Sequence, residues 1–422
     1  MIETRPQKTQ ERALLIGLEK EGVSKWDLQD SLDELRELAN SAGAEVVDTV
    51  TQKLRKPTAP YYIGRGKAES IKNSCQDRHV TSVIFDDELS PAQGRNLENL
   101  LARKVLDRTQ LILDIFAQRA RSREGRLQIE LAQLQYLLPR LTRMWHHLSR
   151  QTGGIGTRGP GETQLEVDRR RVQERIARLE RELEAVRKTR AIQRQGRKRH
   201  QWPVAAVVGY TNAGKSTLLN LLTGADVVTQ NKLFATLDPT TRSFVLPNKQ
   251  RVLLTDTVGF LRKLPHTLIE SFKATLEEVG EADLLIHIVD LSHPRVDEQM
   301  EAVDSVIKEL DAHGKQTLIV FNKIDNLPNR ELAESYVKRF PGSVAISART
   351  GEGVNKLVQT LENALSSWRL RSRLRIPSNE SALIAEIHRV GHVLELRYEG
   401  NDALIIAHVP PELAQKLERF AA

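Results

Sequence analysis

The residues best suited to chemistry lie in a glycine-rich loop that follows an apolar run at residues 204–208 and precedes a helical pattern. This order of strand, GxxxxGKS loop and helix is specific for a phosphate-binding loop, in which backbone N–H groups surround the anion. We expect Lys215 to reach the β- and γ-phosphates of a nucleotide and Ser216 to ligate Mg²⁺. The loop consists of Gly209, Tyr210, Thr211, Asn212, Ala213, Gly214, Lys215 and Ser216.

Three further motifs follow later apolar runs, and they point to guanine as the base. In the DxxG motif, Asp256 would hold Mg²⁺ through water and the N–H of Gly259 would face the γ-phosphate. In the NKxD motif, the Asp325 carboxylate can accept hydrogen bonds from guanine N1–H and the 2-amino group, a pair that adenine does not offer. A Ser-Ala-Arg turn then supplies a backbone N–H for the guanine carbonyl. The three motifs comprise Asp256, Thr257, Val258 and Gly259, then Asn322, Lys323, Ile324 and Asp325, and finally Ser347, Ala348 and Arg349. Together the four motifs predict a GTP-selective site.

Hydrolysis depends on positions that these motifs mark less clearly. Ras-type enzymes place a water-orienting Gln directly after DxxG, but this chain has Phe260 there. We therefore expect a slow basal rate, with the missing element supplied by a partner, a switch movement or an ion. Asn212 either ligates K⁺ beside the β–γ bridge, as in potassium-activated GTPases, or only stabilises the loop. In the first switch, Thr236, Thr240 and Thr241 all carry a hydroxyl that could close over Mg²⁺. The first-switch residues that we expect to contact the nucleotide are Phe234, Ala235, Thr236, Leu237 and Asp238.

The elements that must position these residues form several domains, because 422 residues are too many for one compact domain. Residues 202–368 alternate strand-like and helical patterns and contain the nucleotide motifs. Residues 1–118 show the same alternation, which predicts a small α/β domain with a largely parallel sheet. Its strand-like runs lie at residues 13–18, 45–48, 82–85 and 111–113.

Residues 119–200 are predicted to form a long antiparallel helical hairpin with a Gly-rich tip at 149–162. Apolar residues recur at steps of four and three along both arms, which is the spacing of a coiled-coil seam, and Pro139 should kink the first arm. The two stripes are Leu127, Leu131, Leu134, Leu138, Leu141, Trp145 and Leu148, and Val172, Ile176, Leu179, Leu183 and Val186. The segment has 21 Lys or Arg against nine Asp or Glu, a net charge of +12 in a chain of net charge +8. This indicates an RNA-binding arm, with a solvated coiled-coil face as the alternative. The expected RNA contacts are Arg150, Arg158, Arg169, Arg170 and Arg171.

The remaining sequence features set limits on the class of protein. A basic linker at 368–375 leads to a C-terminal α+β module at 376–422, with three short strands within 381–409 and a helix at 412–420. Cys75 is the only cysteine, which excludes an intramolecular disulfide and a Cys-cluster metal site. No apolar run approaches the ~20 residues that span a bilayer. We expect a cytoplasmic protein that is monomeric when free and has no membrane partner.

The chain resembles the HflX family of ribosome-associated GTPases, within the Obg–HflX group, over essentially its whole length. The resemblance rests on residues 62–67, the tip string from residue 153 to residue 166, the P-loop, residues 234–242 and residues 256–261. It implies that Thr236 is the Mg²⁺ ligand of the first switch. The candidate catalytic residues are Lys215, Thr236, Gly259 and, if it ligates K⁺, Asn212. The resemblance also implies binding to the large ribosomal subunit and its RNA, and splitting of ribosomes under stress, with subunit biogenesis as a further translation role.

One alternative function stays open. Gly64-Arg65-Gly66-Lys67 follows a strand and opens a helix, where an anion could bind, although the full Walker spacing is absent. The alternative is therefore an RNA-remodelling NTPase with a second nucleotide site in the N-terminal domain. His388 and His392 are placed on presumed strands as ordinary residues. His146 and His147 are unsuited to share a metal, since adjacent helical residues diverge by about 100°.

Overall fold

The computed structural model describes residues 11–22, 24–144, 164–198, 202–224, 234, 240–263, 278–310, 312–366 and 370–422. The chain divides into two compact units. The first comprises Met1–Val186 with Lys232–Leu237 and Arg262–Phe272, and the second comprises Arg187–Asn231, Asp238–Leu261 and Lys273–Ala422. Two short stretches beside the nucleotide motifs thus belong with the N-terminal half of the chain.

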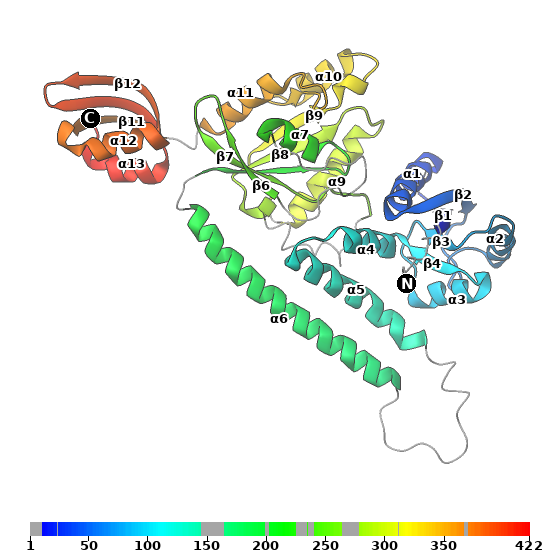
Figure 1. The fold of residues 1–422 in the computed structure, drawn as a ribbon. Coiled ribbons are helices and arrows are strands. Elements are labelled where there is room, and N and C mark those ends of the chain that lie inside the picture. The colour runs from blue at the N-terminus through cyan, green and yellow to red at the C-terminus, as the bar shows by residue number, and fades with distance from the viewer. Residues whose placement is uncertain are drawn as a thin grey trace, which may run out of the picture. The chain divides into compact units, whose positions relative to one another are not determined.

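The N-terminal domain is built on a four-stranded parallel sheet of order β2-β1-β3-β4 (Figure 1). Its strands are β1 (Glu11–Glu19), β2 (Ala44–Lys53), β3 (Ser82–Phe85) and β4 (Lys104–Asp107), and its helices are α1 (Lys25–Ala42), α2 (Arg65–Asp77), α3 (Pro91–Leu101) and α4 (Arg108–Arg119). The chain leaves β1 toward β2 on one side and leaves β3 toward β4 on the other. The carboxyl ends of β1 and β3 therefore form the topological switch point of this sheet.

Local sequence explains where these helices begin and end. α1 starts with a capping box, in which the Ser24 hydroxyl accepts from the Asp27 N–H and the Asp27 carboxylate accepts from the Ser24 N–H. It ends at Gly43, whose φ of 95° suits a residue without a Cβ. The strand predicted at residues 111–113 is wrong, because these residues lie in α4, which Asp107 caps. A run of three apolar residues has no period that separates a buried helix from a strand.

The predicted hairpin seam is present between α5 (Arg123–Met144) and α6 (Gln164–Lys198), which lie side by side in Figure 1. Seven predicted seam residues pack together, and Arg175 of α6 forms a 2.7 Å ion pair with Glu130 of α5. These seam residues are Leu127, Leu131, Leu134, Ile176, Leu179, Leu183 and Val186. Pro139 lies inside α5. The tip at 149–162, with Arg150 and Arg158, and the pair His146 and His147 lie outside the described residues.

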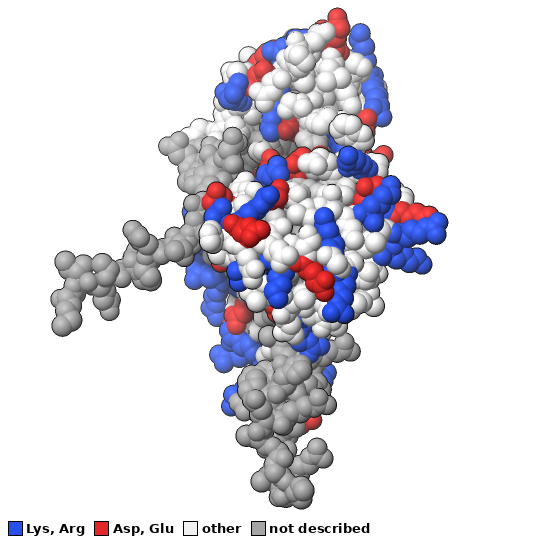
Figure 2. Space-filling model, turned by 90° about the vertical axis from the view of Figure 1, so that its right-hand side faces the viewer, with Lys and Arg blue, Asp and Glu red and all other residues white. Residues whose placement is uncertain are grey.

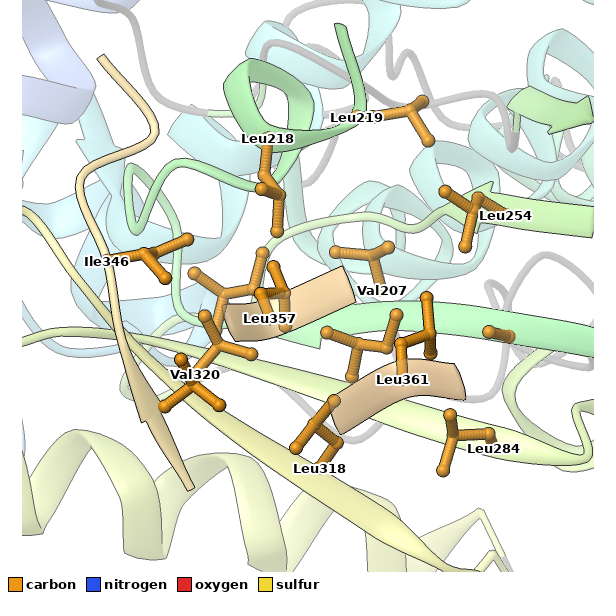
Figure 3. Packing of buried hydrophobic residues seen from close by; sticks show 14 of the residues in the cluster. Val207, Leu218, Leu219, Leu254, Leu284, Leu318, Val320, Ile346, Leu357 and Leu361 are labelled. Carbon is orange, nitrogen blue, oxygen red and sulfur yellow. The ribbon is translucent and has the colours of Figure 1, made fainter. Parts of the chain in front are cut away.

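The domain with the nucleotide motifs contains a six-stranded sheet of order β10-β9-β8-β5-β7-β6. All neighbouring pairs are parallel except β6 with β7. The strands are β5 (Val204–Gly209), β6 (Thr240–Val245), β7 (Arg251–Asp256), β8 (Leu284–Asp290), β9 (Thr317–Asn322) and β10 (Val344–Ala345). The described helices are α7 (Lys215–Thr223), α9 (Val296–Glu309), α10 (Glu331–Arg339) and α11 (Val354–Ala364). Leu357 and Leu361 of α11 pack with Val207, Val320 and other buried residues of the sheet (Figure 3). Each fully buried Leu contributes about 1.5–3 kcal/mol.

The C-terminal module differs from its prediction in two places. The supposed basic linker is largely strand β11 (Leu370–Pro377), so the module's sheet begins before residue 376. Residues 381–390 form helix α12 (Ser381–Val390), which includes His388, whereas His392 begins a strand. β12 (His392–Glu399) and β13 (Asp402–Val409) complete an antiparallel sheet of order β11-β13-β12. α13 (Pro411–Leu417) forms as expected, and it shares an apolar core with α12 and the sheet.

The predicted α/β fold class, with a P-loop domain, an N-terminal α/β domain, a helical hairpin and a C-terminal α+β module, is confirmed. Over the described ranges, no helix is both long and apolar enough to cross a membrane. On the face shown in Figure 2, Lys and Arg are interspersed with Asp and Glu.

Candidate functional site

The P-loop is fixed by two glycines that no other residue could replace without strain. Gly209 ends β5 with a φ of 152°, and a Cβ built on it would lie 2.3 Å from the Ile288 carbonyl oxygen. Gly214 precedes α7 with a φ of 99°, and its Cβ would lie 2.2 Å from Nδ2 of Asn322. The loop is therefore packed against β8 and against the NKxD motif. Its turn leaves the first N–H groups of α7 at the site where phosphates bind in such loops.

Lys215 is held at the mouth of this loop. Its Nζ donates to the carbonyl oxygens of Gly209 at 3.1 Å and Tyr210 at 2.7 Å, and the residue is 7% exposed. Burial lowers the pKa of Lys215 to about 8, an effect that Asp256 opposes and Lys323 reinforces. An ammonium in this position, oriented by two carbonyls and desolvated, would gain strongly from a phosphate that replaces lost hydration.

Two of the three predicted Mg²⁺ ligands, Ser216 and Asp256, are brought together. The Ser216 hydroxyl donates to the carboxylate of Asp256 at 2.7 Å, and Asp256 is fully buried at the end of β7. A hydroxyl beside a buried carboxylate is an all-oxygen donor set that fits Mg²⁺, which in such sites takes its other ligands from phosphates and water. Among the described residues, no group of three or more His, Cys, Asp or Glu could hold a metal without such help.

The NKxD and Ser-Ala-Arg motifs, which are predicted to bind the base, lie together. Asp325 accepts from the Ser347 hydroxyl at 2.7 Å and pairs with Arg349 at 2.8 Å. The Ser347 hydrogen bond, opposed by desolvation, lowers the pKa of Asp325, so the carboxylate is ionised at neutral pH. An ionised carboxylate accepts and does not donate, which is what the two N–H groups of guanine require.

Asn322 links the two halves of the site. Its Nδ2 donates to the Ala213 carbonyl oxygen of the P-loop at 2.8 Å. Its Oδ1 accepts from the Ala348 N–H at 2.9 Å. Both groups of one amide are thus used to hold the phosphate loop and the base-binding turn in register. This role was not predicted from the sequence, which assigned Asn322 only to the nucleotide.

Phe260, which stands where a water-orienting Gln is found in Ras-type enzymes, is 2% exposed. Its backbone pairs with the P-loop, because its N–H donates to the Gly209 carbonyl oxygen at 3.1 Å and its carbonyl oxygen accepts from the Thr211 N–H at 2.8 Å. The adjacent Gly259 packs so closely that a Cβ on it would lie 2.9 Å from Nζ of Lys215. The DxxG segment is therefore closed onto the phosphate loop.

Two further residues near the site were missed. Asp290, the last residue of β8, accepts from Nζ of Lys323 at 2.6 Å. Its position at the carboxyl end of a strand beside NKxD was the signal that could have found it. His287 is 2% exposed in β8, where burial, and secondarily Lys215, lowers its pKa to about 4. It is therefore neutral at physiological pH.

Several residues predicted to belong to the site lie outside the described part of the chain. Ala235, Thr236, Leu237 and Asp238 lie among the residues that are not described, and Phe234 belongs to the N-terminal compact unit. Asn212 has a φ of 60° and is exposed, which suits either of its two proposed roles. The assignment of individual residues to nucleotide, metal and RNA thus stays a prediction.

Comparison with known proteins assigns the parts of the chain separately. Residues 29–117 match the family described as GTP-binding GTPase N-terminal, and residues 119–197 match the GTP-binding GTPase Middle Region. Residues 204–323 match the family described as 50S ribosome-binding GTPase. Among solved structures, a GTP-binding protein of Sulfolobus solfataricus in complex with GDP is 26% identical, with a TM-score of 0.46, and the match covers 85% of this chain and 99% of that one.

Curated relatives match at higher identity. The GTPase HflX of Caldanaerobacter subterraneus subsp. tengcongensis is 46% identical over 413 residues, which is 98% of this chain and 94% of the relative. The GTPase HflX of Escherichia coli is 47% identical over 365 residues, covering 86% and 85% of the two chains. Because identity of this order extends over nearly the full length, the chain belongs to the HflX family of GTPases and hydrolyses GTP.

Proposed function

We propose that this GTPase binds the large ribosomal subunit in a nucleotide-dependent way and acts in translation, by splitting stalled or stressed ribosomes. The description of the family matched by residues 204–323, a 50S ribosome-binding GTPase, supports the partner. A role in subunit biogenesis would use the same partner. With a ribosomal partner, the expected location is the cytoplasm.

The observation that carries this proposal is the charge of the hairpin. Its net charge of +12 exceeds that of the whole chain, +8, so the rest of the chain has a net charge of −4. Arg169, Arg170 and Arg171 are exposed near the start of α6. Arg170 lies 3.7 Å from Glu174 and Arg171 lies 3.8 Å from Asp168, and both acids are on the same helix. Ion pairs between exposed side chains contribute little stability, so these Arg side chains can exchange them for contacts with phosphates, which are the usual basis of RNA-backbone binding.

The roles at the nucleotide site form part of the same proposal. Lys215 contacts the β- and γ-phosphates, and Ser216 with Asp256 holds Mg²⁺. Asp325 selects guanine. Thr236 closes over the metal, and Gly259 faces the γ-phosphate. A bound Mg²⁺ would offset charge on the phosphates, while Lys215 and the loop amides orient them.

Charge reversal on helix α6 tests whether the hairpin binds ribosomal RNA. Changing Arg169, Arg170 and Arg171 to Glu should weaken binding to large subunits and flatten its salt dependence. The slope of log K against log salt should fall by roughly two to three units, since three fewer phosphates release counterions. A matched control reverses the same number of exposed charges on other helices: Lys308, Lys338 and Lys356. Equal slopes for the α6 variant and the wild-type protein would refute the docking role of the arm.

The alternative of a second nucleotide site in the N-terminal domain gains no support. Gly64 caps α2, but its N–H donates to Oε1 of Gln52 at 2.9 Å. The carboxyl edge of the N-terminal sheet, where such folds bind ligands, holds Asp86 and Asp87. Two carboxylates oppose the binding of nucleotide phosphates.

A further inference from the structure

Strand β12 of the C-terminal module leaves one side of its backbone open. It is the outer strand in the order β11-β13-β12, and over the described residues no strand pairs with its second side (Figure 1). The row of backbone N–H and C=O groups on such an edge is a template for pairing with another chain. Two large apolar side chains of this strand also face solvent, since Leu394 is 47% exposed and Tyr398 is 64% exposed. The edge thus has the features of an interaction surface.

The two faces of β12 differ in character. Leu396 pairs with the buried Ile405 of β13 and packs against the apolar core of the module. Glu395 and Arg397 lie on the opposite face, where they form a 2.6 Å ion pair along the strand. The bulge of β12 lies between Val393 and Glu395, so side chains alternate regularly from Glu395 onward. One face of the strand is therefore charged and the other is apolar.

The order of these residues makes β12 complementary to a second copy of itself. When two copies pair antiparallel about Leu396, this residue lies opposite its own copy, and Glu395 lies opposite Arg397 of the second copy. The same register sets Leu394 opposite Tyr398. Both ion pairs then form on the charged face, and the two copies of Leu396 meet on the apolar face. A shift of the register by one residue would mix the faces, and pairing about Glu395 or Arg397 would oppose like charges.

One other register also opposes unlike charges. Pairing about Tyr398 sets Arg397 opposite Glu399, but β12 ends at Glu399 and the chain turns at Gly400, so few residues remain to pair. Pairing about Leu396 instead leaves three β12 residues on each side. The charges and the length of the strand therefore favour the same register.

We propose that β12 is a self-recognition edge, through which two copies of this chain pair antiparallel about Leu396 and join their C-terminal sheets. Charged side chains on an edge strand commonly prevent such pairing, but here their order selects a second copy. A contact of one strand per copy is smaller than the ~20–30 residues per side of a standard interface, so the dimer is transient. The free protein, expected from the sequence to be monomeric, is on this proposal in equilibrium with a dimer.

Charge reversal in the full-length protein tests the pairing. Glu395→Arg leaves two arginines on the charged face, and Arg397→Glu leaves two glutamates, so each variant opposes like charges when it pairs with itself. Each should self-associate roughly tenfold more weakly than the wild type, or weaker still. An equimolar mixture of the two variants restores both ion pairs and should associate as the wild type does. Arg389→Glu, a reversal of an exposed charge on α12, is the matched control and should change nothing.

Sedimentation velocity over a concentration series measures these associations, and far-UV circular dichroism checks that each variant is folded. A mixture of the two variants that associates no better than either variant alone would overturn the proposal. A wild-type protein that stays monomeric up to about 1 mM would also overturn it, because pairing weaker than this has no bearing on the free protein. The edge would then be left to a partner of another kind.

Introduced cysteines test the register. Cys75, the only cysteine of the chain, is fully buried, so a new thiol on β12 can be followed by itself. Leu396→Cys would set two thiols directly opposite each other, at the Cα separation of about 4.5–5.5 Å that a disulfide can span. Mild oxidation should therefore cross-link this variant, whereas Tyr398→Cys, which faces Leu394, should cross-link far less. Preferential cross-linking of Tyr398→Cys would overturn the register, and cross-linking of neither variant would overturn the pairing.

Discussion

Replacement of Asp325 by Asn should change the base that this GTPase binds. The Asp325 side chain is 11% exposed and is oriented by Ser347 and Arg349. Asn keeps one acceptor oxygen but presents an NH₂ group to the guanine 2-amino group, so one charge-assisted hydrogen bond becomes a donor–donor contact. A lost hydrogen bond to a charged group costs about 1.5–3 kcal/mol, and the unpaired donor adds about 1–3 kcal/mol. Together these costs amount to about 2.5–6 kcal/mol, so GTP affinity should fall by roughly two to four orders of magnitude.

Xanthosine triphosphate provides the positive readout. Xanthine has a carbonyl oxygen where guanine has its 2-amino group, so the Asp325→Asn variant should bind it more tightly than the wild-type protein does. A Ser347→Ala control removes the hydroxyl that orients Asp325 and should weaken GTP binding without any gain for xanthine. Binding of fluorescent nucleotides measures all three proteins. An unchanged affinity for GTP after Asp325→Asn would refute the base assignment.

Three further predictions concern the phosphate side. Because the pKa of Lys215 is about 8, GTP affinity should fall as pH rises above 8 and the ammonium is lost, whereas Lys215→Arg should remove this component of the pH profile. Replacing K⁺ with Na⁺ should slow turnover if Asn212 ligates the ion, and equal rates in the two salts would leave Asn212 as a loop residue only. Gly214→Ala should abolish tight nucleotide binding and lower the thermal midpoint, because its Cβ would lie 2.2 Å from Asn322 at a φ of 99°; wild-type binding by this variant would contradict the loop geometry.

The nucleotide site was the most predictable part of the chain, for a physical reason. Each motif needs a strand before it and a fixed turn after it, so the residues of Gly209–Ser216 define their own local structure. β11 was missed although it alternates Arg373 and Arg375 with buried Leu374 and Ile376, because its charge made it look like a linker. Residues 111–113 were too few to show a period.

Contacts between distant parts of the sequence could not be predicted from local sequence patterns. Lys263 and Asp86 are 177 residues apart and belong to no common motif. The two hydrogen bonds of the Asn322 amide, to Ala213 and to Ala348, likewise depend on how separate loops meet in the fold. A single stretch of sequence does not show this. The seam between α5 and α6 was predicted correctly because each helix shows the apolar period in its own sequence.

Sedimentation of the full-length protein with purified large ribosomal subunits tests the central proposal most directly. The assay compares a non-hydrolysable GTP analogue with GDP at one salt concentration, and small subunits serve as the control. We expect the protein to pellet with large subunits, and more of it to do so with the GTP analogue than with GDP. Equal pelleting with both nucleotides, or no preference for large over small subunits, would contradict it.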